Sequence, residues 1–280
     1  MMAALLSDIA DRLASVSDTS FLDASVLLAH ILEKPRSWVL AHPELVLTED
    51  QQKKLNNALT RLEKGEPFPY VLGHWEFFGM DFDILPVVLI PRPETELLVE
   101  KAIAWLQASP ARRTVADVGT GSGAIAVSIA VNVPDAFILA TDISQDALQV
   151  AQRNARKFNV DHRVKFVQCD LLPGMSSMDQ HLDLICANLP YIPTETLHKL
   201  PIYGREPTLA LDGGEDGLDL FRRLIKLGPD WLAPHALILL EIEATRGLQA
   251  LSLAYVMFPE AEIHLHQDLT GLDRLLEIAL

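Results

Sequence analysis

The sequence is poor in cysteine and lacks any long apolar run. Two cysteines, Cys169 and Cys186, are too few for a disulfide framework in 280 residues, so we expect reduced, buried thiols, as in a cytosolic protein. The longest stretch without a charge, 118–134, contains three glycines and ends in proline, unlike a membrane span. Residues 1–16 have no basic start, so we expect no signal or transit peptide. These absences predict a cytoplasmic protein without membrane association.

Basic residues are also scarce. Lys and Arg number 23 against 38 Asp and Glu, which gives a net charge of −15. This balance argues against direct nucleic-acid binding, because such affinity depends on cations that neutralise phosphates. A basic protein partner remains compatible with it. With 49% hydrophobic residues the chain has the composition of a folded protein, and its length suits one large domain or two unequal domains.

The N-terminal region predicts a helical domain over residues 1–70. Apolar residues recur at helical spacing within 5–16 and 22–31, and Thr48 with Gln51 forms a capping-box pattern before a further helix. Residues 71–92 are rich in aromatic residues, proline and glycine, which indicates a linker. Within it we expect 75–82 and 83–90 to pair as a β-hairpin.

Residues 93–280 predict a Rossmann-like α/β domain. Short apolar or β-branched runs alternate with helical stretches, which indicates a mostly parallel sheet with helices on both faces. The predicted strands are 115–118, 137–141, 164–168, 182–187 and 236–242, followed by two closing strands at 262–266 and 275–280. The predicted helices include 122–131, 144–158 and 218–227.

A glycine-rich loop follows the first of these strands and opens a helix. Glycine allows the tight turns and the close backbone approach that a ligand phosphate or nucleoside needs. About 20 residues later, Asp142 ends the second strand, where its carboxylate can accept hydrogen bonds from both ribose hydroxyls, and Asp170 is expected to border an adenine. The candidate cofactor-binding residues are Asp117, Gly119, Thr120, Gly121, Ser122, Gly123, Asp142 and Asp170.

The loop leaves two cofactors open. Gly119, Gly121 and Ala124 satisfy the dinucleotide fingerprint, so a nicotinamide-dependent oxidoreductase is a competing hypothesis. The compact G-x-G-x-G spacing and the preceding Asp117 favour S-adenosylmethionine instead. A carboxylate there can orient the loop and meet the methionine amino group, directly or through water.

Asn188, Leu189, Pro190 and Tyr191 follow the strand 182–187. Ligands of open parallel sheets bind at the carboxyl ends of strands, so this tetrapeptide is expected beside the glycine loop. An amide or exocyclic nitrogen is a poor nucleophile because its lone pair is delocalised. The Asn188 carboxamide oxygen and the backbone carbonyl of Leu189 could direct that lone pair by accepting the nitrogen's hydrogens. Pro190 would orient this carbonyl, and Tyr191 would offer a flat surface.

Other hypotheses remain open from the residues alone. An exocyclic-amine methyltransferase of nucleic acid would need the same clamp, although the charge argues against it, and a non-catalytic adaptor is a further alternative. Glu94 and Glu96 suit either catalysis or a helix N-terminus, and Arg92 suits either substrate orientation or a salt bridge. His264 and His266 lack a third ligand at suitable spacing, so we expect no metal.

Taken together, these motifs resemble the HemK/PrmC family, the protein-(glutamine-N5) methyltransferases of peptide chain release factors. The resemblance includes the helical domain, Ile90-Pro91-Arg92-Pro93-Glu94-Thr95-Glu96, the glycine loop, residues 188–191, 206–218 and 268–274. It implies a class I methyltransferase fold with a seven-stranded sheet and an N-terminal substrate-recognition domain.

The resemblance also implies roles for residues. Gly119 to Gly123, Asp142, Asn188 and the backbone at Leu171 would hold S-adenosylmethionine, with S-adenosylhomocysteine as the product. Asn188, Leu189, Pro190 and Tyr191, with Arg92, would hold the glutamine of the Gly-Gly-Gln loop of class I release factors. The family usually has Asn-Pro-Pro-Tyr, so Leu189 is a departure. Relatives that methylate a ribosomal protein usually lack the run 93–96, which therefore favours a release factor. We expect a monomer.

Overall fold

The computed structural model describes residues 2–173 and 181–280. The chain divides into two compact units, Met1–His74 and Trp75–Leu280. The domain boundaries expected at residues 70 and 92 remain predictions. Within the described ranges, no helix is long and apolar enough to cross a membrane.

The first unit is helical, as predicted. Thr48 and Gln51 form the expected capping box: the Thr48 N–H donates to Gln51 Oε1 at 2.9 Å, and the Gln51 N–H donates to Thr48 Oγ1 at 3.3 Å. Leu27 and Leu55 are fully buried in its core. Its helices are α1 (Met2–Leu13), α2 (Ser20–Leu32), α3 (Arg36–Ala41), α4 (Glu49–Glu63) and α5 (Phe68–Leu72).

The β-hairpin exists, but its predicted strands were wrong. The strands are β1 (His74–Phe77) and β2 (Met80–Asp83), and the turn falls at Phe78 and Gly79. Both turn residues have positive φ, 53° and 70°, which suits the twist of a two-residue hairpin loop. Residues 84–90 therefore follow the hairpin and form neither of its strands.

The second unit contains a seven-stranded sheet in the order β5-β4-β3-β6-β7-β9-β8. Strands β3 to β7 pair in parallel, and β9 is antiparallel to both β7 and β8. This confirms the predicted Rossmann-like, mostly parallel sheet. The strands are β3 (Thr114–Val118), β4 (Phe137–Asp142), β5 (Val164–Gln168), β6 (Leu182–Ala187), β7 (Leu232–Glu241), β8 (Glu262–Gln267) and β9 (Asp273–Ala279).

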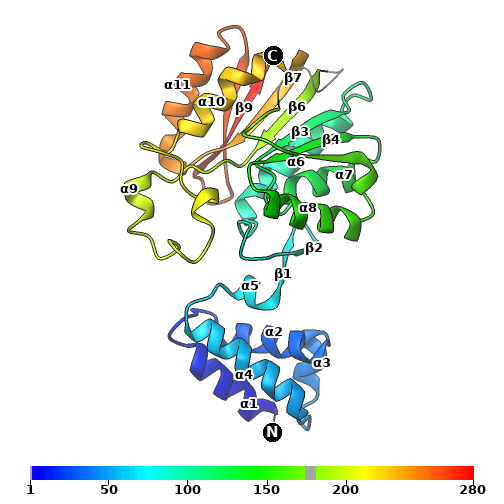
Figure 1. The fold of residues 1–280 in the computed structure, drawn as a ribbon, viewed down its shortest axis with the longest axis vertical. Helices are drawn as coiled ribbons and strands as arrows, with labels where there is room; N and C mark the ends of the chain where they lie inside the picture. The colour runs from blue at the N-terminus through cyan, green and yellow to red at the C-terminus, as the bar shows by residue number, and fades with distance from the viewer. Residues whose placement is uncertain (1, 174–180) are drawn as a thin grey trace. The chain divides into compact units, whose positions relative to one another are not determined.

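Helices cover both faces of the sheet (Figure 1). One face carries α6 (Glu96–Gln107), α7 (Ala124–Asn132) and α8 (Gln145–Lys157); the other carries α10 (Asp219–Leu227) and α11 (Gly247–Met257). The short helix α9 (Thr194–Leu197) follows β6. Because β6 is covered on both sides, five of its six residues are buried and only Asp183 is half-buried, which explains its nearly continuous apolar run.

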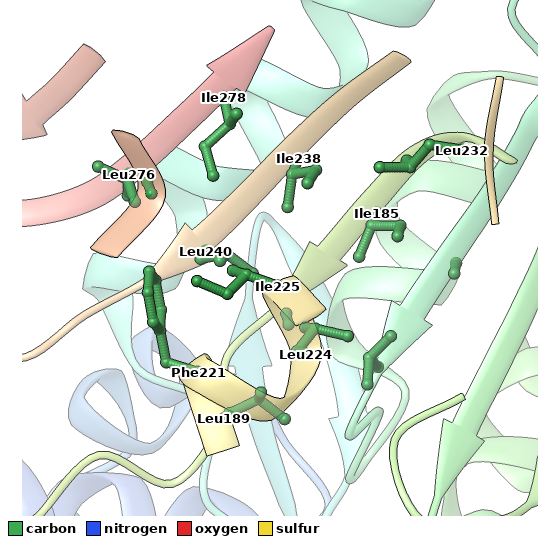
Figure 2. Close-up of a cluster of buried hydrophobic side chains, with 14 of the residues drawn as sticks. Ile185, Leu189, Phe221, Leu224, Ile225, Leu232, Ile238, Leu240, Leu276 and Ile278 are labelled. Atoms are coloured by element: carbon green, nitrogen blue, oxygen red, sulfur yellow. The ribbon is translucent and has the colours of Figure 1, made fainter. Parts of the chain in front are cut away.

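The packing of α10 shows how the sheet is closed. Ile185 of β6 and Ile238 of β7 share a buried cluster with Leu224 and Ile225 of α10, as Figure 2 shows. Phe221 and Leu189 lie at the same cluster, near the carboxyl end of β6. The strand order reverses beside β3, so the carboxyl ends of β3 and β6 border a crevice in which ligands of such sheets bind.

Candidate active site

A cavity of about 870 Å³ lies at the carboxyl ends of β3, β4 and β6. The glycine loop and the turn that begins at Asn188 both contribute to the lining of this cavity, because β3 and β6 are neighbours in the sheet. Asp117, Gly123 and Tyr191 are not among the lining residues. The predicted site residues that do line it are Arg92, Gly119, Thr120, Gly121, Ser122, Asp142, Asp170, Leu171, Asn188, Leu189 and Pro190.

The glycine loop is held by backbone hydrogen bonds. The N–H groups of Gly119 and Thr120 both donate to the Thr141 carbonyl, at 2.9 and 2.8 Å. The three glycines of the loop have φ between 54° and 81°, a region that strains other residues. At Gly123 a Cβ would also lie 3.0 Å from the Cβ of Ala151. The tight loop therefore requires glycine for both conformational and steric reasons.

Asp117 lies behind this loop and is fully buried. Its Oδ2 accepts hydrogen bonds from the Thr120 hydroxyl at 2.6 Å and from the Ala126 N–H at 3.0 Å. Burial raises the pKa of Asp117 to about 7. Its Oδ1 is also buried and has no hydrogen-bond partner among the described residues. Asp117 therefore supports the loop from beneath and keeps one acceptor available.

The tips of β4 and β5 add polar groups to the cavity. Asp142 accepts from the Gly121 N–H at 2.9 Å and from the Ser144 N–H at 2.8 Å, so it ties the loop to the second strand. Asp170 forms a half-exposed ion pair with Arg223 at 2.6 Å. Cys169 lines the cavity and is only partly buried, so the expected full burial holds for Cys186 alone.

Leu171 lies at the cavity in an unusual conformation. Its φ is 61°, in the left-handed region, and its carbonyl accepts a hydrogen bond from the Thr141 hydroxyl at 2.6 Å. Thr141 therefore holds both the glycine loop, through its carbonyl, and the segment after β5, through its hydroxyl.

The other end of the cavity depends on a side-chain network. Asn188 Nδ2 donates to Thr95 Oγ1 at 2.9 Å, and the Thr95 hydroxyl donates to Glu241 Oε2 at 2.6 Å. The Tyr191 hydroxyl donates to Glu241 Oε1 at 3.4 Å. Thr95 and Glu241 were given no role from the sequence. The available signal was a glutamate that ends the apolar strand β7.

Burial controls the ionisation of this network. It raises the pKa of Glu241 to about 7. The pKa of Tyr191 is raised above its ordinary value, first by burial and then by the charge of Glu241. Tyr191 therefore remains a neutral phenol and a hydrogen-bond donor at physiological pH. It borders a separate, small cavity together with Glu241.

The segment after α9 braces the turn that carries Pro190 and Tyr191. The Gly213 N–H donates to the Ile192 carbonyl at 2.9 Å, and the Ile192 N–H donates to the Leu211 carbonyl at 3.1 Å. A Cβ on Gly213 would lie 2.8 Å from the Pro190 carbonyl oxygen. Glycine is thus needed for close approach, a role that the sequence did not reveal.

Arg92 and Glu96 have defined partners. Arg92 lines the cavity and forms an ion pair with the buried Glu206 at 2.5 Å. Of the two roles considered for Arg92, substrate orientation and a salt bridge, the salt bridge is therefore observed. Glu206 also accepts from the Ile90 N–H at 3.0 Å. Glu96 lies in the first turn of α6 and accepts from the Phe78 N–H at 2.8 Å, which is a structural contact.

The histidines weighed as metal ligands contact glutamates. His264 pairs with Glu262 at 2.9 Å, and His266 pairs with Glu277 at 2.8 Å. Across residues 2–173 and 181–280, no group of three or more His, Cys, Asp or Glu side chains could hold a metal ion.

This sheet order, with a glycine loop after β3 and an Asn-Leu-Pro-Tyr turn after β6, defines a class I methyltransferase. The methyltransferase domain family model matches residues 111–208, and the PrmC N-terminal domain model matches residues 4–73. The catalytic domain of hMettl16 in complex with MAT2A 3′UTR hairpin 6 has a similar fold. Its TM-score is 0.54 at 16% identity, over 84% of this chain and 83% of that one.

Two relatives identify the family more closely. The release factor glutamine methyltransferase of Moorella thermoacetica is 42% identical over 254 residues, which is 90% of this chain and 89% of the relative. That of Coxiella burnetii is 38% identical over 269 residues, 96% of this chain and 95% of the relative. The chain belongs to the release factor glutamine methyltransferase family, which confirms the resemblance to the HemK/PrmC family.

Proposed function

We propose that the protein transfers the methyl group of S-adenosylmethionine to the side-chain amide nitrogen of the glutamine in the Gly-Gly-Gln loop of class I release factors, in the cytoplasm. Membership of the family supports a methyltransferase that acts on release factors. The observation that carries the finer proposal is the Asn188 side chain. It lines the same cavity as the glycine loop, and its Nδ2 donates a hydrogen bond to Thr95 Oγ1.

The cavity suits the cofactor. Its volume of about 870 Å³ lies in the range of ligand pockets, and its wall combines the glycine loop with acids at two strand tips. Asp117 lies behind the loop and does not line the cavity, so its Oδ1, unpartnered in the described chain, would meet an amino group through a bridging water. Gly119, Gly121 and Asp142 would hold the nucleoside part of S-adenosylmethionine. The backbone of Leu171 would contact the same part. When bound, S-adenosylmethionine supplies a methyl group activated by its sulfonium.

The chain's own contribution is to hold the acceptor nitrogen. The oxygen of the Asn188 carboxamide and the carbonyl of Leu189 accept the two hydrogens of the glutamine amide and direct its lone pair toward the methyl group. This requires positioning and electrostatics more than a strong base. The Leu189 side chain lies 3.1 Å from where a Gly119 Cβ would be, so it packs against the glycine loop. Its carbonyl is retained, so the substitution for proline preserves the acceptor.

The test is incubation with labelled S-adenosylmethionine and a class I release factor, followed by mass mapping. We expect a single added methyl group on the Gly-Gly-Gln peptide, and none on a release factor whose glutamine is replaced by alanine. Ribosomal proteins serve as the parallel substrate. Label on a ribosomal protein in place of the release factor would contradict the proposed substrate.

A further inference from the structure

The carboxamide of Asn188 has two ends of similar shape and opposite polarity. Only its oxygen can accept a hydrogen from a glutamine amide, whereas its nitrogen can only donate. The chain must therefore distinguish these two orientations, which differ by a rotation of the amide. Shape alone cannot do so, because oxygen and NH₂ occupy nearly the same volume.

Thr95 provides this distinction through its single hydroxyl hydrogen. The hydroxyl donates that hydrogen to Glu241 Oε2 at 2.6 Å. An ionised carboxylate accepts and cannot donate. With its hydrogen committed, Thr95 Oγ1 can only accept from Asn188, which it does from Nδ2 at 2.9 Å. The amide nitrogen of Asn188 is thus turned toward Thr95. The amide oxygen at the other end of the carboxamide remains available to accept a hydrogen bond.

Glu241 is placed to act on Thr95 and not on a ligand. It is 5% exposed and Thr95 is 4% exposed, so bulk water competes little for either hydrogen bond. Glu241 is not among the residues that line the large cavity. The Tyr191 hydroxyl donates to its other oxygen at 3.4 Å, so the carboxylate is held from both sides.

We propose that Thr95 and Glu241 are positioning residues that fix the Asn188 carboxamide with its oxygen toward the glutamine amide. This inference rests on the proposed role of Asn188 in methyl transfer. It assigns the run Pro93-Glu94-Thr95-Glu96 a function in orienting the acceptor clamp, through a threonine that precedes α6.

The network has a consequence for pH. A protonated Glu241 has a hydrogen of its own to donate to Thr95, which frees the Thr95 hydroxyl to donate to Asn188 Oδ1 and to turn the amide around. The groups that face Glu241 are Thr95, Tyr191, Arg274 of β9 and Glu94; Arg274 favours the ionised form, and Glu94 opposes it. Burial raises the pKa of Glu241 to about 7. Turnover should therefore fall as pH decreases below 7.

The experiment compares Thr95→Val, Thr95→Ser, Glu241→Gln and Asn188→Ala. Thr95→Val keeps the shape and removes the hydroxyl, so we expect kcat to fall about 10- to 100-fold, with KM for release factor and Kd for S-adenosylmethionine changed less than about threefold. Thr95→Ser restores the hydroxyl and should recover kcat to within about threefold. A purely steric role for Thr95 would leave Thr95→Val more active than Thr95→Ser.

Glu241→Gln supplies the second readout. Its amide can donate to Thr95 at any pH, so kcat should fall and its decline below pH 7 should disappear, while cofactor affinity is retained. Wild-type kcat and pH dependence in both Thr95→Val and Glu241→Gln, with Asn188→Ala inactive, would overturn the positioning inference alone. Retained methyl transfer in Asn188→Ala would instead overturn the proposed function. Binding of S-adenosylmethionine shows whether each variant is folded. If Thr95→Val does not fold, the activity of Thr95→Ser tests the role of the hydroxyl in its place.

Discussion

The two ends of the cavity are built in different ways. At the glycine loop, a buried carboxylate, Asp117, has partners three and nine residues away in the sequence. At the Asn188 turn, a buried carboxylate, Glu241, has partners 146 and 50 residues away. Each acid has its pKa raised to about 7 by burial. The buried acid at one end is therefore held by nearby residues of the chain, and the buried acid at the other end by residues that only the assembled fold brings close.

This contrast separates binding from chemistry. The backbone amides of the glycine loop are held by groups on the neighbouring strand β4, about 20 residues further along the chain. The proposed amide clamp depends on side chains that are 50 or more residues apart in the sequence. Damage at the glycine loop should weaken cofactor affinity. Damage at the Asn188 end should lower turnover and leave cofactor affinity largely unchanged.

The largest expected effect follows removal of the clamp. Asn188→Ala eliminates one of the two acceptors proposed for the glutamine amide, so we expect kcat to fall about 100- to 1000-fold. Affinity for S-adenosylmethionine, measured by calorimetry, should change less than about threefold. Asn132→Ala is the matched control: Asn132 is exposed at the end of α7 and does not line the cavity. An equal loss of affinity and turnover in Asn188→Ala would contradict the division between the two ends.

The next largest expected effect is that of the buried acids Glu241 and Asp117 on the pH dependence of stability. In the unfolded chain they ionise at their ordinary values, 4.5 for Glu241 and 3.8 for Asp117, but when folded they keep their protons up to about pH 7. The folded state binds more protons in this window, so the free energy of unfolding should fall as pH rises from about 4 to 7. For Glu241 the shift corresponds to about 3 kcal/mol.

Urea unfolding at several pH values measures this dependence. Glu241→Gln should flatten the pH dependence of the unfolding free energy, and Asp117→Asn should flatten it by a similar amount. Unfolding free energy that rises through this window in wild type, with no change in Glu241→Gln, would contradict the assigned ionisation.

A smaller effect is expected at the glycine loop. Gly123→Ala places a Cβ 3.0 Å from Ala151 at φ 81°, and Gly271→Ala places one at φ 80° with nothing within 4 Å. Both substitutions carry left-handed strain of about 1–2 kcal/mol. Only Gly123→Ala should also weaken S-adenosylmethionine binding, by about tenfold, because it displaces the loop. Equal affinities in the two variants would indicate that the loop tolerates the shift.

The same contrast explains what the sequence could predict. The glycine loop, Asp142 and the strand pattern are local signals, and the structure brings these residues to one cavity. The link from Thr95 to Glu241 joins residues 146 positions apart, which no spacing rule reveals. The hairpin was misplaced because Phe78, an aromatic residue, adopts the positive φ of its turn. Close approach at Gly213 depends on Pro190, which lies in another segment of the chain.

The smallest effect concerns recruitment of the substrate. The net charge of −15 should attract a basic release-factor loop, so KM for the release factor should rise several-fold between about 50 and 300 mM salt. A Gly-Gly-Gln peptide without charged residues is the matched control, and its KM should stay nearly constant. Asn188→Ala should retain the wild-type salt dependence of binding, because charge acts over the whole surface while the clamp acts at one amide. Equal salt dependence for the charged and neutral substrates would refute the electrostatic contribution and leave the clamp untouched.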